Sequence, residues 1–190
     1  MFLLRDDISE IVQLLETGGL LCYPTDTVWA VGCDATNEAS LERLAKLTGR
    51  KAGKGYVILV DSLQMLRRYV PEIHPRIQTL LAYHQRPITI IYKKALGLPV
   101  PVKAADGSVA IRVTQDEFCL ELIRGLDKPI VSAIAAKEGE PFPQTFGGIS
   151  SEILGAVDYV VKYRQDDKTP EQPSSMAYLD GSKELEFIRE

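Results

Sequence analysis

Short apolar runs alternate with segments of helical periodicity along most of this sequence, and that alternation constrains the fold more than any other feature. The apolar runs at residues 56–60, 88–92, 108–113 and 128–134 each have the length of a buried strand. Elsewhere apolar residues recur three and four apart, as in residues 8–15. This alternation predicts an α/β sheet with helices packed on it, with mixed strand directions near the end of the chain.

The same patterns predict the individual elements. Asp6 or Asp7 can cap the helix over residues 8–15, and Asn37 can cap a second helix that includes Leu41, Leu44 and Leu47. Further helices are predicted at residues 61–66, 73–83, 117–124 and 149–154, and further strands at 20–23, 157–161, 176–179 and 185–188, the last two as a hairpin. Residues 48–55, 93–106 and 139–148 are predicted loops.

Composition and charge indicate one globular domain spanning residues 1–190, since no linker-like stretch divides the chain. A net charge of −4 argues against a protein that coats nucleic acid by neutralising phosphates, although a local basic patch is not excluded. The three cysteines have no Cys-x-x-Cys spacing and the two histidines have no partner spacing, which predicts a reducing compartment and no metal site. The start of the chain turns acidic before a signal peptide could develop, and no run approaches ~18 apolar residues, so we expect a cytoplasmic protein without a membrane segment.

A polar segment, Pro24-Thr25-Asp26-Thr27, separates two apolar runs. We call it the PTDT segment (residues 24–27). It follows a predicted buried strand, and ligands of open α/β sheets bind where strands leave the sheet at their carboxyl ends. Thr25 and Thr27 are therefore candidate ligand-binding residues, although the same residue types also suit a turn in which side chains satisfy backbone donors.

Two further features supply cations. Arg50, Lys51 and Lys54 lie in a glycine-rich loop that suits a phosphate or carboxylate, but this loop lacks the Gly-Lys-Ser/Thr ending of a Walker loop and is also compatible with a solvated charged loop. Arg112 lies in a buried strand, so its guanidinium must reach solvent, a carboxylate or an anionic ligand. Arg50 could also form a basic rim for RNA, together with the pairs at residues 67–68 and 93–94.

The ordered set of motifs resembles the YrdC-type threonylcarbamoyl-AMP synthases over nearly the whole chain. The motifs are GGLLCYPTDTVWAVGCDA at residues 18–35, the basic loop, PITII at 87–91, VAIRV at 109–113, Gly-x-Pro at 139–141, PSS at 173–175 and the terminal Ile-Arg at 188–189. The resemblance implies a twisted mixed sheet with packed helices around a deep basic cavity, sometimes described as binding double-stranded RNA. It also implies an enzyme that joins L-threonine, bicarbonate and ATP into threonylcarbamoyl-AMP and pyrophosphate for modification of adenosine 37 of tRNA.

The resemblance also implies roles for single residues. Magnesium would arrive with ATP, no tightly bound cofactor is expected, and other proteins of the tRNA modification pathway are expected partners. The implied substrate-binding residues are Thr25, Thr27, Arg112, Ser174 and Ser175; the implied nucleotide-binding residues are Arg50, which is also the catalytic residue, Lys54, Ser108 and Arg189.

Several positions depart from the family pattern, and most of them fall on the nucleotide side. Thr48 stands where the family has lysine, and Ile134, Ala136 and Glu138 stand where it has serine, asparagine and serine. Each lost charge-assisted contact removes roughly 1.5–3 kcal/mol of binding free energy, unless Lys51 or Lys54 replaces the lysine. The sequence therefore leaves two main hypotheses: a synthase, or a catalytically weak paralogue that binds a nucleotide, a small carboxylate or double-stranded RNA without turnover. A different chemistry in the same cavity is a third.

Overall fold

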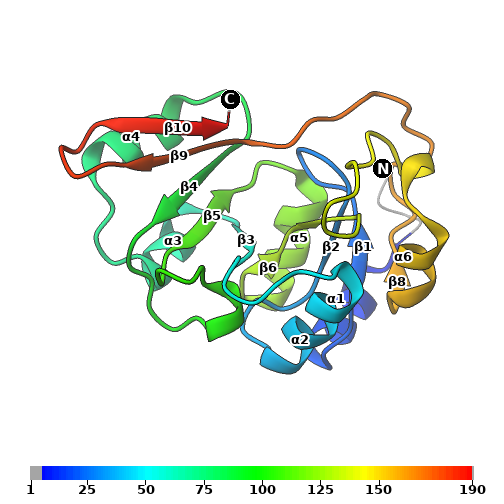
Figure 1. Ribbon diagram of the computed structural model, residues 1–190. Coiled ribbons are helices and arrows are strands. Elements are labelled where there is room, and N and C mark those ends of the chain that lie inside the picture. Colours follow the sequence, from blue (N-terminus) through cyan, green and yellow to red (C-terminus); the bar gives the residue numbers. More distant parts are fainter. Residues whose placement is uncertain (1–5, 190) are drawn as a thin grey trace.

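A computed structural model describes residues 6–189, and within that range the chain forms two β-sheets (Figure 1). The four-stranded sheet has the order β7-β2-β1-β8 and contains β1 (Leu21–Tyr23), β2 (Ala30–Gly32), β7 (Ala133–Ile134) and β8 (Tyr159–Val160). The six-stranded sheet has the order β10-β9-β4-β5-β3-β6 and contains β3 (Val57–Val60), β4 (Ile88–Tyr92), β5 (Val109–Val113), β6 (Ile130–Val131), β9 (Ser175–Leu179) and β10 (Leu185–Arg189).

Polar side chains cap the helices, and Asp7 and Asn37 do so as the sequence predicts. Asp7, Asn37, Ser62 and Asp116 each accept a backbone N–H from the first turn of the helix that follows. The helices are α1 (Ile8–Glu16), α2 (Glu38–Thr48), α3 (Leu63–Tyr69), α4 (Pro75–Tyr83), α5 (Glu117–Leu126) and α6 (Ser151–Ala156), with short 3₁₀ turns η2 (Val100–Val102) and η3 (Phe146–Gly148).

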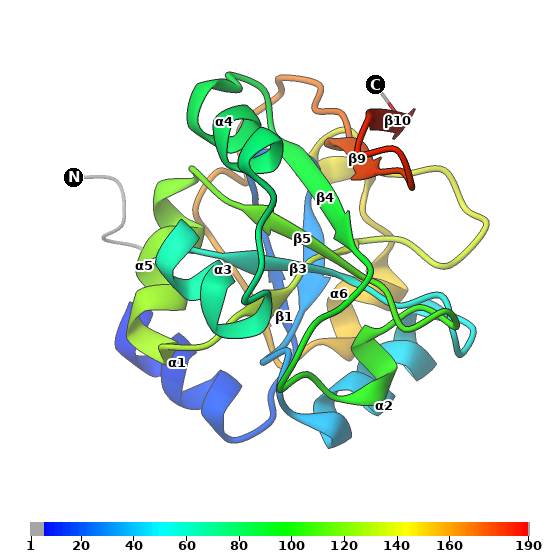
Figure 2. The same cartoon turned by 90° about the vertical axis from the view of Figure 1, so that its left-hand side faces the viewer.

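The helices cover the outside of the two sheets. Figure 2 shows α3 and α4 in front of β3, β4 and β5, while α1 packs against α5 and α5 packs on β3. The core between these layers is continuous and includes the fully buried side chains of Tyr23, Leu59 and Phe118. No helix within residues 6–189 is long and apolar enough to cross a membrane.

The predicted strand over residues 128–134 is broken at Ser132, and this break joins the two sheets. Before it, β6 pairs with β3 in the six-stranded sheet, and after it, β7 pairs with β2 in the four-stranded sheet. The backbone N–H of Ser132 donates to the Val57 carbonyl (2.8 Å), so the chain is held at the point where it changes sheets. An apolar run does not show such a change of partner, because the same residues suit a continuous strand.

The expected α/β class with mixed strands is confirmed, with three corrections. Antiparallel pairing is already present between β1 and β2, because the PTDT segment turns the chain back on itself, and is not limited to the end of the chain. The strands form two sheets and not one. Thr48 belongs to α2 and not to the following loop, since its hydroxyl donates to the Leu44 carbonyl one turn earlier (2.9 Å).

Candidate functional site

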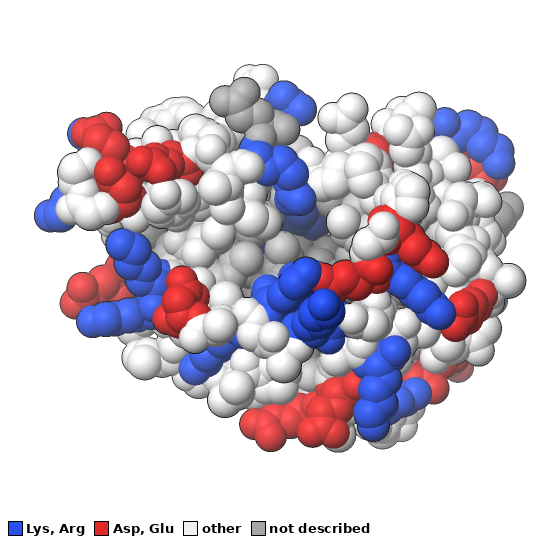
Figure 3. Space-filling model, in the orientation of Figure 1, with Lys and Arg blue, Asp and Glu red and all other residues white. Residues whose placement is uncertain are grey.

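A cavity of about 150 Å³ opens between the two sheets. Figure 3 shows a hollow in the middle of this face, with Lys and Arg side chains gathered above and below it. The residues that line the cavity include Thr27, Arg50, Tyr56, Arg112, Ser132, Ser174 and Arg189. Residues from six separate stretches of the sequence therefore meet here, and five of the residues named are predicted site residues.

The PTDT segment forms one wall through an internal hydrogen-bond network. The Thr25 hydroxyl contacts the carbonyl of Val28, the backbone N–H of Thr27 and the Thr27 hydroxyl, each at 2.9 Å. If Thr25 donates its proton to the carbonyl, Thr27 must donate to Thr25, and the Thr27 oxygen keeps a lone pair for a donor in the cavity. Thr25 thus shapes the turn and does not line the cavity, whereas Thr27 lines it.

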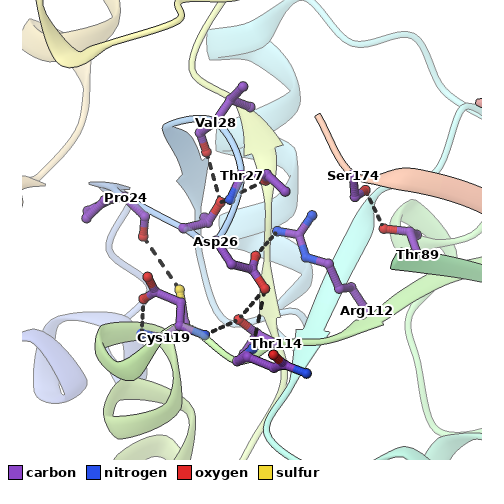
Figure 4. Close-up of polar contacts among 12 residues, drawn as sticks. Pro24, Asp26, Thr27, Val28, Thr89, Arg112, Thr114, Cys119 and Ser174 are labelled. Carbon is purple, nitrogen blue, oxygen red and sulfur yellow. Dashed lines mark hydrogen bonds and ion pairs between the residues drawn. The ribbon is translucent and has the colours of Figure 1, made fainter. Parts of the chain in front are cut away.

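Arg112 lies at the bottom of the cavity, with 3% of its side chain exposed. Its Nη2 lies 3.2 Å from Oδ1 of Asp26, whose Oδ2 accepts from the Thr114 hydroxyl (3.2 Å) and the Gln115 N–H (3.3 Å). Figure 4 shows the guanidinium between Asp26 on one side and Ser174 on the other. Nη2 of Arg112 is thus ion-paired with Asp26, whereas Nε has no hydrogen-bond acceptor within residues 6–189. A buried guanidinium with an unused donor is suited to bind a carboxylate.

The opposite wall comes from the start of β9 and the end of β10. The Ser174 hydroxyl shares a hydrogen bond with Thr89 (2.8 Å), and Arg189 donates from Nε to the Ser174 carbonyl (2.7 Å). Burial, and then the positive charge of Arg112, lower the pKa of Arg189. Two guanidinium groups thus disfavour each other in this cavity, and an anion between them would relieve that repulsion. Ser175 does not line the cavity; its backbone N–H donates to Pro87 (3.1 Å).

Two neighbouring cavities share Arg50 with the cavity above, and one of them holds two further predicted nucleotide-binding residues. Lys54 and Ser108 line a cavity of about 160 Å³ with Arg50. The Ser108 hydroxyl donates to Asp106 (2.6 Å). The Arg50 guanidinium stacks over the Tyr56 ring at 5.1 Å and donates to the backbone carbonyls of Gly55 and Lys54.

The substituted positions line the other neighbouring cavity, of about 230 Å³, which includes Thr48, Ile134, Ala136, Glu138 and Phe142. Ile134 is 36% exposed and Phe142 is 37% exposed, so this cavity has an apolar surface where the family pattern has hydrogen-bonding side chains. Glu138 forms an ion pair with Lys54. The departures seen in the sequence therefore lie together in space.

The sequence did not predict two contacts of the PTDT segment. The first is the ion pair of its Asp26 with Arg112, although a buried arginine is itself a signal that a carboxylate lies nearby. The second is Arg164, which has a positive φ of 64° and donates to the Thr25 carbonyl (3.0 Å), Asp116 (3.1 Å) and Glu171 (3.2 Å). Arg164 fastens the polar stretch before β9 to the PTDT segment.

Metal binding has no support from the part of the chain that the structure describes. Between residues 6 and 189, no group of three or more His, Cys, Asp or Glu side chains is placed to hold a metal ion. His74 accepts from the backbone N–H of Arg76 at the start of α4 (3.2 Å). The arrangement of arginines and hydroxyls is suited to bind anions.

Comparison with known proteins identifies the family of the chain. The family model of Sua5/YciO/YrdC proteins, described as "Telomere recombination", matches residues 13–190. A threonylcarbamoyl-AMP synthase of Thiobacillus denitrificans is 32% identical over 175 residues, covering 90% of each chain, and one of Xanthomonas euvesicatoria is 30% identical over 158 residues, covering 82% of this chain and 84% of that protein.

Solved structures share the fold. Two structures of Sua5 from P. abyssi superpose with TM-scores of 0.84 and 0.79 at 22% and 23% identity, and the second is a complex with L-threonine. These matches cover 96% and 90% of this chain but 55% and 50% of the Sua5 chains, so the present chain spans about half of Sua5. The family match over most of the chain, with relatives at 30% identity and above, confirms the resemblance: the chain belongs to the Sua5/YciO/YrdC family.

Proposed function

We propose that this protein is a threonylcarbamoyl-AMP synthase that joins L-threonine, bicarbonate and ATP, with release of pyrophosphate, for the modification of tRNA adenosine 37. The single observation that carries the proposal is the buried Arg112 guanidinium, which lines a cavity of about 150 Å³ and whose Nε has no acceptor among residues 6–189. That volume suits a small amino acid better than a nucleotide. Relatives named threonylcarbamoyl-AMP synthase and the threonine complex of Sua5 support the choice of ligand.

The amino-acid end of the reaction follows from the cavity walls. The threonine carboxylate would bind Arg112, and its ammonium group would donate to the free lone pair of Thr27. Ser174 lies on the opposite wall, where a hydroxyl of the ligand could exchange hydrogen bonds with it. These contacts position the nitrogen for reaction with bicarbonate: the ammonium group first releases one proton to solvent, and the neutral amine then reacts with bicarbonate to give N-carboxythreonine and water.

The second step is transfer of AMP. A carbamate oxygen of N-carboxythreonine attacks the α-phosphorus of ATP, the bond from that phosphorus to the oxygen bridging to the β-phosphate breaks, and pyrophosphate leaves. Negative charge accumulates on the phosphoryl oxygens, and Arg50 and Arg189, which line the cavity together with Arg112, would stabilise it. Magnesium would enter with ATP.

Pyrophosphate release from purified protein with L-threonine, bicarbonate and Mg-ATP tests the proposal. We expect threonine-dependent release that Arg50→Ala abolishes. In a separate titration, Arg112→Met should weaken threonine binding at least tenfold, because a methionine cannot pair with the carboxylate. Glu184→Gln, an exposed position on the β9–β10 hairpin, is the matched control. Unchanged threonine affinity in Arg112→Met would refute the role of Arg112.

A specific observation supports a second candidate. The cavity that contains Ile134 and Ala136 offers an apolar surface, and Lys54 is paired with Glu138. These features favour a paralogue that binds an amino acid but turns ATP over weakly or not at all. Threonine binding without pyrophosphate release would select this candidate. Binding of double-stranded RNA stays a prediction, for which the cations around the hollow give a surface (Figure 3).

A further inference from the structure

Glu138 occupies an unusual position for a carboxylate, at the border of the anion-binding cavities. Its backbone N–H donates to the Thr48 carbonyl at the end of α2 (2.7 Å), which holds residues 136–140 against the basic loop. Oε1 pairs with the Lys54 ammonium, and Oε2 is buried with no hydrogen-bond donor among the described residues. The hydrogen bond from Lys54 holds the pKa of Glu138 below its usual range, so the carboxylate is ionised at neutral pH.

The cations around these cavities already have partners within residues 6–189. Arg50 donates to two backbone carbonyls of its own loop, Lys54 pairs with Glu138, and Lys137 pairs with Glu152 (2.5 Å). Of these partners, only Glu138 both lines the cavity of about 230 Å³ and carries a full negative charge. A polyphosphate that approaches Lys54 therefore meets a carboxylate that competes for the same ammonium group.

We propose that Glu138 is a specificity-determining residue, because its ion pair with Lys54 competes with phosphates for the same ammonium group. A triphosphate then binds tightly only when the Lys54–Glu138 ion pair opens. This inference deepens the proposed function and rests on it for the identity of the nucleotide. The ion pair is half-exposed on the lysine side, with 52% of Lys54 and 23% of Glu138 accessible. Such a pair is weak enough to open, and the closed fraction lowers the apparent affinity of any ligand that needs Lys54.

Calorimetric titration of the full chain with Mg-ATP, and separately with inorganic tripolyphosphate, tests the proposal. We expect Glu138→Gln to tighten both roughly three- to tenfold, because it removes the competing charge and keeps the side-chain size. Glu184→Gln is the matched control, since it removes the same charge from the exposed Arg76–Glu184 pair (2.9 Å) and touches none of the cavities described above. It should leave both affinities unchanged.

The double mutant distinguishes competition for Lys54 from a general repulsion of phosphates by the Glu138 charge. Lys54→Met should change the affinity of the parent protein less than about twofold, because Lys54 is already occupied, but should weaken the Glu138→Gln variant at least threefold. The inference is overturned if Glu138→Gln binds no more tightly than the parent, or if Lys54→Met has the same effect in both backgrounds. Glu138→Ser should give the same gain as Glu138→Gln, so poor folding of one variant does not decide the outcome.

Both titrations measure binding, so their results do not depend on catalysis. If no pyrophosphate is released but Glu138→Gln tightens tripolyphosphate binding, the synthase proposal fails and the role of Glu138 stands. If pyrophosphate is released and Glu138→Gln has no effect on either affinity, the synthase proposal stands and the role of Glu138 fails.

Discussion

Removal of the Asp26 carboxylate should leave Arg112 as a buried positive charge without a counterion. Arg112 is 3% exposed and Asp26 is its one ion-pair partner among residues 6–189. Breaking a buried pair from one side costs about 3–5 kcal/mol of stability. The contact here is a single one of 3.2 Å, so we expect Asp26→Asn to lower the free energy of unfolding by about 3 kcal/mol.

Asp26→Ala should cost more than Asp26→Asn, because it also removes the acceptor for two further groups. Oδ2 of Asp26 accepts from the Thr114 hydroxyl and from the Gln115 N–H, at 3.2 and 3.3 Å, and asparagine can keep one oxygen there. At about 1 kcal/mol for each hydrogen bond, the alanine variant should lose about 5 kcal/mol in total.

Urea unfolding followed by the fluorescence of Trp29 measures both losses. Trp29 is the one tryptophan of the chain, is buried, and stands two residues after the PTDT segment. For a chain of this size, a loss of about 3 kcal/mol lowers the melting temperature by roughly 6–12 °C. Glu184→Gln, which breaks an exposed ion pair, supplies the comparison. A loss below about 1 kcal/mol in Asp26→Asn would refute the reasoning, because Arg112 would then be solvated well enough to need no counterion.

Three other predictions concern other parts of the structure. Gly32→Ala should destabilise the protein by about 3 kcal/mol in urea unfolding, because a Cβ there would lie 1.9 Å from the Val131 carbonyl oxygen. Gly181→Ala should be nearly neutral, because nothing lies within 4 Å of its Cβ, and equal stability of the two variants would contradict the prediction. Arg164→Ala should release the Thr25 carbonyl and Asp116 and so weaken threonine binding several-fold, measured by titration against Glu184→Gln; unchanged binding would show that the PTDT segment holds its shape alone. Burial raises the pKa of both Cys22 and Cys33 from about 9 to about 12, so the stability that these neutral thiols contribute is fully present below pH 9. Between pH 9 and 12, ionisation of each thiol in the unfolded chain should lower the free energy of unfolding by up to about 1.4 kcal/mol per pH unit. A flat stability profile above pH 9 would contradict the burial of the two thiols.

The sequence predicts local structure well where the signal is itself local. Asn37 and Ser62 cap helices because their side chains bond to N–H groups only three residues away, and a polar residue before an apolar periodic stretch reveals this directly. The strand over residues 88–92 is confirmed with the same bounds, because its β-branched run contains no competing helical period.

Contacts between distant residues are the part that the sequence does not specify. The break at Ser132 depends on Val57, which accepts from the Ser132 N–H, and on Cys33, which accepts from the Val131 N–H, so the strand changes sheet for reasons that lie 75 or more residues earlier. The pairing of Arg112 with Asp26 and of Lys54 with Glu138 likewise depends on how the sheets bring separate loops together. Residue types predicted the kind of site here, whereas only the fold decides which cations remain available to a ligand.

The change of sheet at Ser132 also sets an order of events during synthesis. Residues 130–134 form one edge of each sheet, so neither β3 nor β2 has its edge partner until these residues have left the ribosome. The parallel pair of β4 with β9 then joins positions almost 90 residues apart, and pairings of such long range form slowly. A nascent chain that stops short of residue 130 would expose the unpaired edges of β2 and β3 together, and unpaired strand edges favour aggregation.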